Sequence, residues 1–459
     1  MSWMNQLEEY SQSVMETYTS QLVRLVKIPS ISAHAENRED LFKILEEMGN
    51  ITSEYGMRSE IIETEGAPVF LAELETDPNA PWILIYNHMD VQPANEPQWI
   101  TKPFEPVVKD GRIIGRGSTD DKGPALSIIH AIHFLASQKI PLPNIQVVYE
   151  TEEEIGSPYF GAFLDQNRDK FRNPQSILVS DTIFEGSHPA ITYSLKGMAR
   201  FEIELKTGSK DLHSGVFGNA VENPLNLLVR ALATCVDAKG RILIPEMLAD
   251  IAPPTDRENF ELRKVAEVFD LEGLKRDSAF ASLYSENALD ILDGVWRRPT
   301  FEIHGFEGAQ WEPGVLKSAL PYHVKAKVST RLVPGQNPER VHEQLEKHLK
   351  KIDHRIGVKL LSGQSPAVAS LDNPFMDQAI EACKTGFGEE PLFVGCGGTI
   401  GAIPEMQRVF PWAPVVLIAQ SLMSDGYHAP NEEFRLSQAC SGMKTMASYL
   451  NRIATLTVT

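Results

Sequence analysis

Cysteine is scarce in this chain, with four residues among 459 and no pair spaced as CxxC. This scarcity argues against a disulfide-stapled scaffold and against a cysteine-based zinc site. A metal bound here would need histidine and carboxylate ligands. The same scarcity predicts a reducing, cytoplasmic setting.

Positive charge and long apolar runs are also lacking. Lys and Arg number 43 against 62 Asp and Glu, which gives a net charge of −19. This balance argues against nucleic acid or an anionic membrane as a partner. No stretch approaches the ~20 apolar residues that span a bilayer. The first nine residues, Met1 to Glu9, have neither the basic nor the apolar region of a secretory signal.

The pattern of apolar residues predicts an α/β protein with an insertion. Short apolar runs alternate with helical stretches, which favours a mixed, largely parallel sheet flanked by helices; the runs are 69–74, 82–86, 146–149 and 176–180. Near residue 191 the pattern changes to half-exposed antiparallel strands such as Ala199–Lys206, with helices predicted at 224–238, 259–269 and 338–351. We therefore predict a discontinuous catalytic domain at residues 1–195 and 371–459, and an inserted α+β domain at 196–370.

A histidine and an aspartate follow one of the predicted strands. The run that begins at Trp82 leads directly into His88 and Asp90. In open α/β sheets, ligands gather at the carboxyl ends of the strands. His88 could bind a metal there, and Asp90 could fix the orientation of its ring. An ordinary strand-end loop remains the alternative, since short motifs also match by accident.

Further carboxylates stand at similar places. Asp120 and Asp121 precede a predicted helix within a glycine-rich segment, where they could cap the helix or bridge two cations. Several glutamates follow the strand at 146–149. Such a run is usually a solvated turn, but packed like charges raise one another's pKa unless cations neutralise them. Asp181 ends another strand, and His428 lies far along the chain.

These residues form an inventory of two histidines and several carboxylates without a thiolate. Such ligands suit Zn²⁺ or a harder ion such as Mn²⁺ or Co²⁺. Two cations would allow a shared water to lose a proton near neutral pH, with a glutamate as the general base.

In these motifs the sequence resembles the M20 metallopeptidases, and in particular the carnosinase-type cytosolic dipeptidases. The resemblance runs in order over nearly the whole chain. The motifs that carry it are His88–Pro93, Gly115–Gly123, Glu153–Ser157, Asp181, Asp211–Gly215, Arg331–Pro334, Gly397–Thr399 and His428–Glu432.

The resemblance implies two divalent metal ions per subunit. His88 and Asp181 would bind one ion. Glu154 and His428 would bind the other, and Asp120 would bridge the pair.

The resemblance also implies catalytic and substrate-binding roles. Glu153 would be the general base that deprotonates the bridging water, and Asp90 would orient His88. His213, in a lid and dimerisation domain, would reach the active site of a partner subunit and stabilise the oxyanion, which implies a homodimer. Taken alone, His213 could instead be a helix cap or a core histidine.

Three further residues would bind the substrate. Arg331 would hold its terminal carboxylate with a planar guanidinium, although an arginine on an alternating strand could also be simply solvated. Thr399 and Ser318 stand where the dipeptidases place hydroxyl groups near the substrate. The residue before the glycines is Cys396, where the family often has an acidic residue, so the resemblance is weaker at the substrate pocket.

Three functions therefore remain open. The first is hydrolysis of the amide bond of a small peptide, most simply a dipeptide. The second is an M20-type deacylation of N-succinyl, N-acetyl or N-carbamoyl amino acids. The third is metal binding without catalysis.

Overall fold

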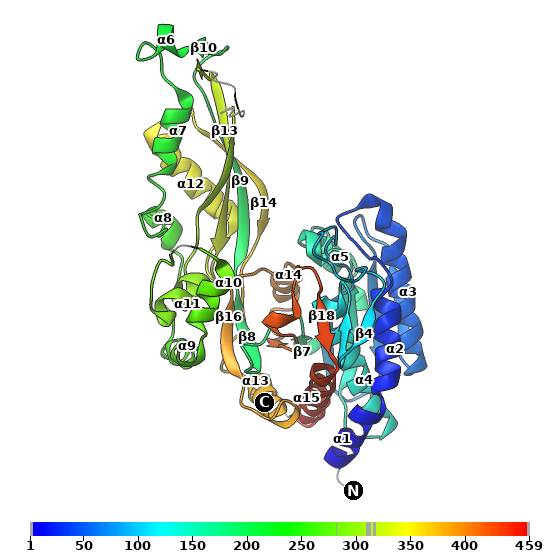
Figure 1. Cartoon of the computed structure of the whole chain (residues 1–459). Helices are drawn as coiled ribbons and strands as arrows, with labels where there is room; N and C mark the ends of the chain where they lie inside the picture. Colours follow the sequence, from blue (N-terminus) through cyan, green and yellow to red (C-terminus); the bar gives the residue numbers. More distant parts are fainter. Residues whose placement is uncertain (1–2, 281, 309–313, 315–317, 457–459) are drawn as a thin grey trace.

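A nine-stranded mixed sheet organises the catalytic part of the chain (Figure 1). The structure is a computed structural model that describes residues 3–280, 282–308, 314 and 318–456. The sheet order is β1-β2-β6-β3-β7-β17-β8-β15, with β16 beside β8. Its strands are β1 (Arg58–Ile62), β2 (Val69–Leu74), β3 (Trp82–His88), β6 (Asn144–Glu150), β7 (Pro174–Val179), β8 (Ala190–Leu195), β15 (Ala367–Val368), β16 (Leu392–Cys396) and β17 (Val415–Ile418).

The centre of this sheet is parallel and buried. Strands β6, β3, β7 and β17 run parallel to one another, and antiparallel pairs lie toward both edges. The apolar runs at 82–86 and 146–149 lie in β3 and β6, whose side chains are buried almost throughout. Continuous apolar runs are typical of strands covered on both faces. Because β16 and β17 follow the insertion, the catalytic part is discontinuous, and the predicted fold class is confirmed.

Helices from both ends of the chain share one apolar core with this sheet. They are α1 (Trp3–Ser13), α2 (Met15–Val26), α3 (Arg38–Glu54), α4 (Gly123–Ser137), α5 (Phe160–Gln166), α13 (Pro374–Gly386), α14 (Ala402–Val409) and α15 (Leu436–Ala454). A small sheet of β4 (Val107–Lys109), β5 (Arg112–Ile114) and β18 (Glu433–Arg435) joins the segment before Gly115 to the segment after Glu432. Two motifs that lie far apart in the sequence thereby become neighbours.

The inserted lid is a four-stranded antiparallel sheet covered by helices on one face. Its strands in order are β11 (Glu302–Glu307), β13 (His323–Leu332), β9 (Gly197–Lys206) and β14 (Gly357–Gln364). Helices α7 (Pro224–Leu232) and α12 (Pro338–Ile352) pack on the face turned away from the catalytic part (Figure 1). The pair β10 (Leu212–His213) and β12 (Ala319–Leu320), with α6 (Ser214–Phe217), forms the outer end of the lid (Figure 1).

Part of the inserted interval packs on the catalytic sheet. Helices α9 (Asp256–Val268) and α11 (Ala288–Arg297) form an apolar cluster with β16, which includes the buried residues Leu262, Trp296 and Val394. Two short helices, α8 (Pro245–Leu248) and α10 (Leu271–Ser278), accompany them. The boundaries 1–195, 196–370 and 371–459 therefore stay a prediction.

The helix predicted at 224–238 is shorter than expected, because α7 ends at Leu232. The backbone then forms a bridge between Val236 and Ile242, and the Asp237 side chain accepts hydrogen bonds from two backbone N–H groups of the turn between them. An aspartate that satisfies turn N–H groups competes with helical hydrogen bonding.

None of the helices in the described ranges is long and apolar enough to cross a membrane.

Candidate metal centre

The predicted metal ligands meet at the carboxyl ends of three adjacent strands. His88 ends β3, Glu154 follows β6, and Asp181 follows β7. Parallel neighbours end at the same edge of a sheet, so these side chains come together there. Asp120 arrives from the turn before α4, and His428 arrives from the C-terminal half. The fold thus collects all five residues that the sequence singled out.

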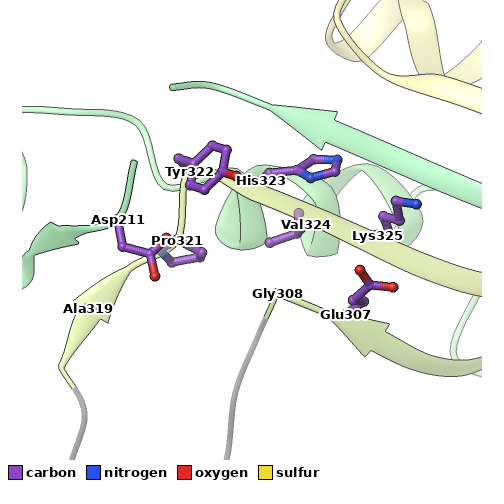
Figure 2. A pocket seen from close by; sticks show the side chains of 9 residues that line it. All are labelled: Asp211, Glu307, Gly308, Ala319, Pro321, Tyr322, His323, Val324 and Lys325. Carbon is purple, nitrogen blue, oxygen red and sulfur yellow. The ribbon is translucent and has the colours of Figure 1, made fainter. Parts of the chain in front are cut away.

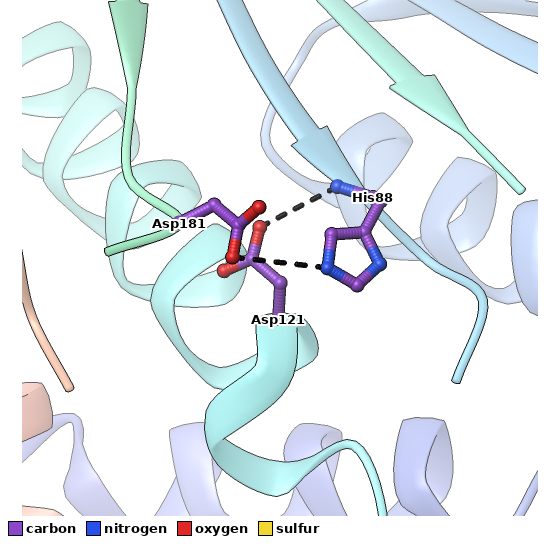
Figure 3. A group of neighbouring side chains, drawn as sticks. All are labelled: His88, Asp121 and Asp181. Atoms are coloured by element: carbon purple, nitrogen blue, oxygen red, sulfur yellow. Dashed lines mark hydrogen bonds and ion pairs between the residues drawn. The ribbon is translucent and has the colours of Figure 1, made fainter. Parts of the chain in front are cut away.

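The first ligand group contains His88, Asp121 and Asp181, which are all buried (Figure 3). One ligand atom from each lies within 4.8 Å of the others. The Nε2 atom of His88 is 3.8 Å from Asp181 Oδ1 and 3.0 Å from Asp120 Oδ1. An ion held by His88 and Asp181 therefore also has Asp120 within reach.

The second ligand group contains Asp120, Glu154 and His428, again with ligand atoms within 4.8 Å of one another. His428 Nε2 is 3.0 Å from Asp120 Oδ2 and 3.1 Å from Glu154 Oε2. Asp120 thus faces His88 with one carboxylate oxygen and His428 with the other. This is the arrangement that a bridging carboxylate requires.

Asp121 has a different set of contacts. Its Oδ2 atom accepts a hydrogen bond of 2.7 Å from Asn87 Nδ2, and its buried Oδ1 atom has no hydrogen-bond partner in the described structure. The sequence motif singled out Asp120 of the pair. The structure adds Asp121 as a carboxylate beside the first group.

The electrostatics of both groups fit divalent cations. Burial disfavours a charge on His88, but Asp181 and a hydrogen bond with Asp120 outweigh it and raise the pKa of His88 well above its ordinary value. Hydrogen bonds with Asp120 and Glu154 raise the pKa of His428 to about 10. The carboxylates therefore attract positive charge at both positions. Imidazole nitrogens and carboxylate oxygens are ligands that Zn²⁺ and Mn²⁺ accept, so the residues present fit two ions.

Asp90 organises both the histidine and the glutamates. His88 Nδ1 donates a hydrogen bond of 3.1 Å to the Asp90 carbonyl oxygen, which orients Nε2 toward Asp120. The Asp90 carboxylate accepts hydrogen bonds from the backbone N–H groups of Glu153 (3.1 Å) and Glu154 (3.0 Å). Asp90 thus holds a metal ligand on β3 through its carbonyl oxygen and the turn that follows β6 through its carboxylate.

The carboxylate of Glu153 has no hydrogen-bond partner in the described part of the chain. Burial, opposed by His88 and reinforced by Asp181 and Glu154, raises the pKa of Glu153 well above its ordinary value. A glutamate in this setting can bind a proton reversibly.

Sequence reasoning missed two residues that hold the ligands in place. Gln92 donates from its backbone N–H to Glu154 Oε1 (3.0 Å) and from Nε2 to Glu154 Oε2 (2.8 Å). Glu432 is fully buried and accepts four hydrogen bonds, from Arg116 Nη1 and from the backbone N–H groups of Gly117, Thr119 and Asp120. Gln92 belongs to the motif His88–Pro93, and Glu432 belongs to the motif His428–Glu432. Their places in these motifs were the signal in the sequence that could have identified them.

Arg331 and Thr399 come together at the inner end of the lid. Arg331 Nη1 donates a hydrogen bond of 3.1 Å to Thr399 Oγ1, which in turn donates to the Lys196 carbonyl oxygen at 2.6 Å. Burial raises the pKa of the nearby Cys396 thiol, on which the charges of Asp181 and Arg331 act with opposite signs. The arginine and the threonine that the sequence singled out therefore contact each other.

His213 and Ser318 lie together at the outer end of the lid, away from both ligand groups of the same chain (Figure 1). The backbone N–H of Ser214 donates to the Ser318 carbonyl oxygen at 3.0 Å, and His213 Nδ1 accepts a hydrogen bond from Gly215 N–H. Within one chain, His213 is the N-cap of α6. It therefore cannot act at the metal ligands of its own chain in this arrangement.

A polar pocket lies close to this outer end. It has a volume of about 250 Å³, and its lining includes Asp211, Tyr322 and His323, which project from neighbouring strands and loops (Figure 2). Glu307 and Lys325 lie further along it. The pocket is separate from both ligand groups.

Comparison with known proteins places the chain in a family. Its sequence matches peptidase family M20/M25/M40 over residues 84–452. The chain belongs to this family. It is therefore a hydrolase of the metallopeptidase class.

Three relatives illustrate the relationship of this M20 enzyme to known proteins. The "Beta-Ala-His dipeptidase" of Homo sapiens is 34% identical over 85% of this chain and 78% of its own length. The "Cys-Gly metallodipeptidase DUG1" of Saccharomyces cerevisiae is 31% identical over 95% of both chains. The "M20 family metallo-carboxypeptidase Sso-CP2" of Sulfolobus solfataricus is 28% identical, with a TM-score of 0.85 over 96% of this chain and 99% of the other.

Proposed function

We propose that this M20 enzyme is a dipeptidase that uses two divalent metal ions. The observation that carries the proposal is the position of Asp120, whose two carboxylate oxygens each lie 3.0 Å from a different histidine. The names of the human and yeast relatives, both dipeptidases, support the substrate class.

The proposed ligands are those that face one another in the structure. His88 and Asp181 would hold one ion, Glu154 and His428 would hold the other, and Asp120 would bridge them. Zn²⁺, Mn²⁺ and Co²⁺ all suit these ligands. When bound, the ions would lower the pKa of a water molecule and polarise the scissile carbonyl group.

Glu153 is the proposed general base. Asp90 fixes its backbone, and Gln92 fixes the neighbouring Glu154, so the Glu153 side chain projects from a held turn. Its carboxylate would take a proton from the attacking water and then give that proton to the leaving amine. Arg331, positioned by Thr399, would bind the terminal carboxylate of the substrate through its planar guanidinium.

His213 and Ser318 would complete the site from a second subunit. Both lie at the outer end of the lid, and their distance from the ligands of their own chain supports action across a homodimer. His213 would donate a hydrogen bond to the developing oxyanion.

A subunit-mixing experiment tests this arrangement. We expect His213→Asn and Glu153→Gln to be inactive separately, and their mixture to regain activity after subunit exchange. In a heterodimer, one site combines an intact Glu153 with an intact His213 from the other chain. Random 1:1 mixing should therefore restore about a quarter of the wild-type activity per site. No recovery, in a mixture shown to contain heterodimers, would mean that His213 acts within its own chain or not in catalysis.

Substrate class is tested with protein reconstituted separately with Zn²⁺ and Mn²⁺. We expect hydrolysis of a panel of dipeptides, no comparable hydrolysis of N-succinyl, N-acetyl or N-carbamoyl amino acids, and loss of activity after chelation. Restoration of activity by added metal is the control for irreversible unfolding. Cleavage of the N-acyl compounds alone would retain the metal centre and change the assignment to a deacylase.

A cytoplasmic location stays a prediction; all four cysteines are free thiols.

A further inference from the structure

The open face of the lid sheet carries a charge pattern that the proposed function does not use. Along β13, Val324, Ala326 and Val328 are buried beneath α7 and α12. Successive side chains of a strand point to opposite faces, so the alternate residues of β13 lie on the other face. That face is turned toward the catalytic part (Figure 1).

Two cations on the outer half of this face have carboxylate partners, whereas Lys206, Lys327 and Lys359 form no ion pair within the described ranges. Lys325 Nζ is 3.1 Å from Glu202 Oε1, and His323 Nε2 is 3.2 Å from Glu204 Oε2. These two pairs join β13 to β9.

The inner half of the face carries two neighbouring arginines. Arg331 pairs in register with Met198, and Arg200 pairs with Ser329, so the two arginines occupy diagonal positions on one face. Diagonal neighbours of this kind are within reach of long side chains. Within the described ranges neither guanidinium forms an ion pair; Arg331 donates to Thr399, and Arg200 donates to Ser362 Oγ at 3.3 Å.

The positive charge of Arg200 acts on Arg331. Burial, followed by the positive charge of Arg200, lowers the pKa of Arg331. Glu302 lies opposite Ser329 on β11 but forms no ion pair with either arginine in the described structure. In a chain with 62 acidic and 43 basic residues, two adjacent cations without a carboxylate partner indicate a place for an anion.

We propose that Arg200 is a specificity-determining residue that binds a second carboxylate of the substrate, so that the enzyme prefers dipeptides whose C-terminal residue is aspartate or glutamate. This inference rests on the proposed function, in which Arg331 binds the C-terminal carboxylate. An acidic side chain on the same residue places its carboxylate a few bonds away. Arg200, diagonal to Arg331 on the same face, is the cation positioned to receive it.

The test compares Gly-Glu with Gly-Gln, which match in size and differ in one charge. We expect wild-type kcat/KM to favour Gly-Glu by about tenfold or more. Arg200→Met should reduce this ratio to near one, mainly through KM, and Arg200→Lys should restore part of it. Higher salt should weaken the wild-type preference, because exposed charges are screened.

Lys359→Met is the matched control. Lys359 lies on β14, opposite Glu202 of β9. On this face of β9, Glu202 is the next residue after Arg200 in the direction away from Arg331. Its loss removes the same charge from the same sheet, and we expect it to leave the Gly-Glu to Gly-Gln ratio unchanged. An unchanged ratio in Arg200→Met, or an equal fall in Lys359→Met, would overturn the inference.

Binding separates this inference from the proposed function. Calorimetry of both dipeptides with Glu153→Gln protein, with and without Arg200→Met, needs no turnover. Tighter binding of Gly-Glu that disappears with Arg200→Met supports the inference even if neither dipeptide is hydrolysed. Equal binding of the two dipeptides to Glu153→Gln protein overturns it, whatever the enzyme hydrolyses.

Discussion

Glu153→Gln should lower kcat for dipeptides by about 10²–10⁴-fold while leaving metal content unchanged. Glutamine keeps the size of the side chain but cannot take the proton of the attacking water. Because the Glu153 carboxylate makes no hydrogen bond to another described residue, the substitution removes no contact that holds the turn. Steady-state kinetics and metal analysis of the same preparation measure both quantities.

Glu152→Gln is the matched control for this variant. Glu152 is the preceding residue, but its carboxylate accepts hydrogen bonds from the backbone N–H groups of Ala67 (3.0 Å) and Tyr159 (2.7 Å). We expect this variant to lose stability and to keep kcat within about tenfold of the wild type. If Glu153→Gln retained comparable activity, another group would have to be the base. If it lost metal, Glu153 would be a ligand.

Asp120→Asn should weaken metal binding at both positions, by about a hundredfold or more at each. An amide supplies only one oxygen and no negative charge, so it cannot face both His88 and His428 with a charged oxygen. Asp120 is the residue that contacts both histidines, at 3.0 Å in each case. Titration with a competing chelator gives the affinity, and elemental analysis gives the number of ions bound.

The adjacent residue provides the control. Asp121 is also buried, but it is hydrogen-bonded to Asn87 and contacts the His88 side of the site only. We expect Asp121→Asn to keep two ions with an affinity loss of about tenfold. If Asp121→Asn instead lost the ion held by His88, while Asp120→Asn kept it, Asp121 would be the ligand at that position and Asp120 would not bridge the ions.

Much of the architecture could be predicted because burial leaves a local pattern in the sequence. The apolar run at 69–74 coincides with β2, and the helix predicted at 338–351 lies within α12. The failure at 224–238 had an equally local cause, since Asp237 organises a turn that continued helix would have excluded.

The candidate site was predictable in composition but not in geometry. Strands that end in histidine or a carboxylate indicated a metal site, and recognised motifs gave the ligand set. Neither signal showed which side chains Asp120 and Asp121 each contact. Neither indicated that Gln92 donates two hydrogen bonds to the Glu154 carboxylate. The Gln92–Glu154 contact joins residues 62 positions apart in the sequence, and no local periodicity encodes such a contact.

The sequence by itself determined most of the elements, the chemical types of the ligands and the family. Only the tertiary structure decided which side chains meet. It brought Glu432 onto the backbone of the Asp120 turn, placed His213 far from the ligands of its own chain, and packed α9 and α11 on the catalytic sheet. The physical reason is that apolar spacing records whether a residue is buried, whereas the partner that buries it is fixed by the packing of distant segments.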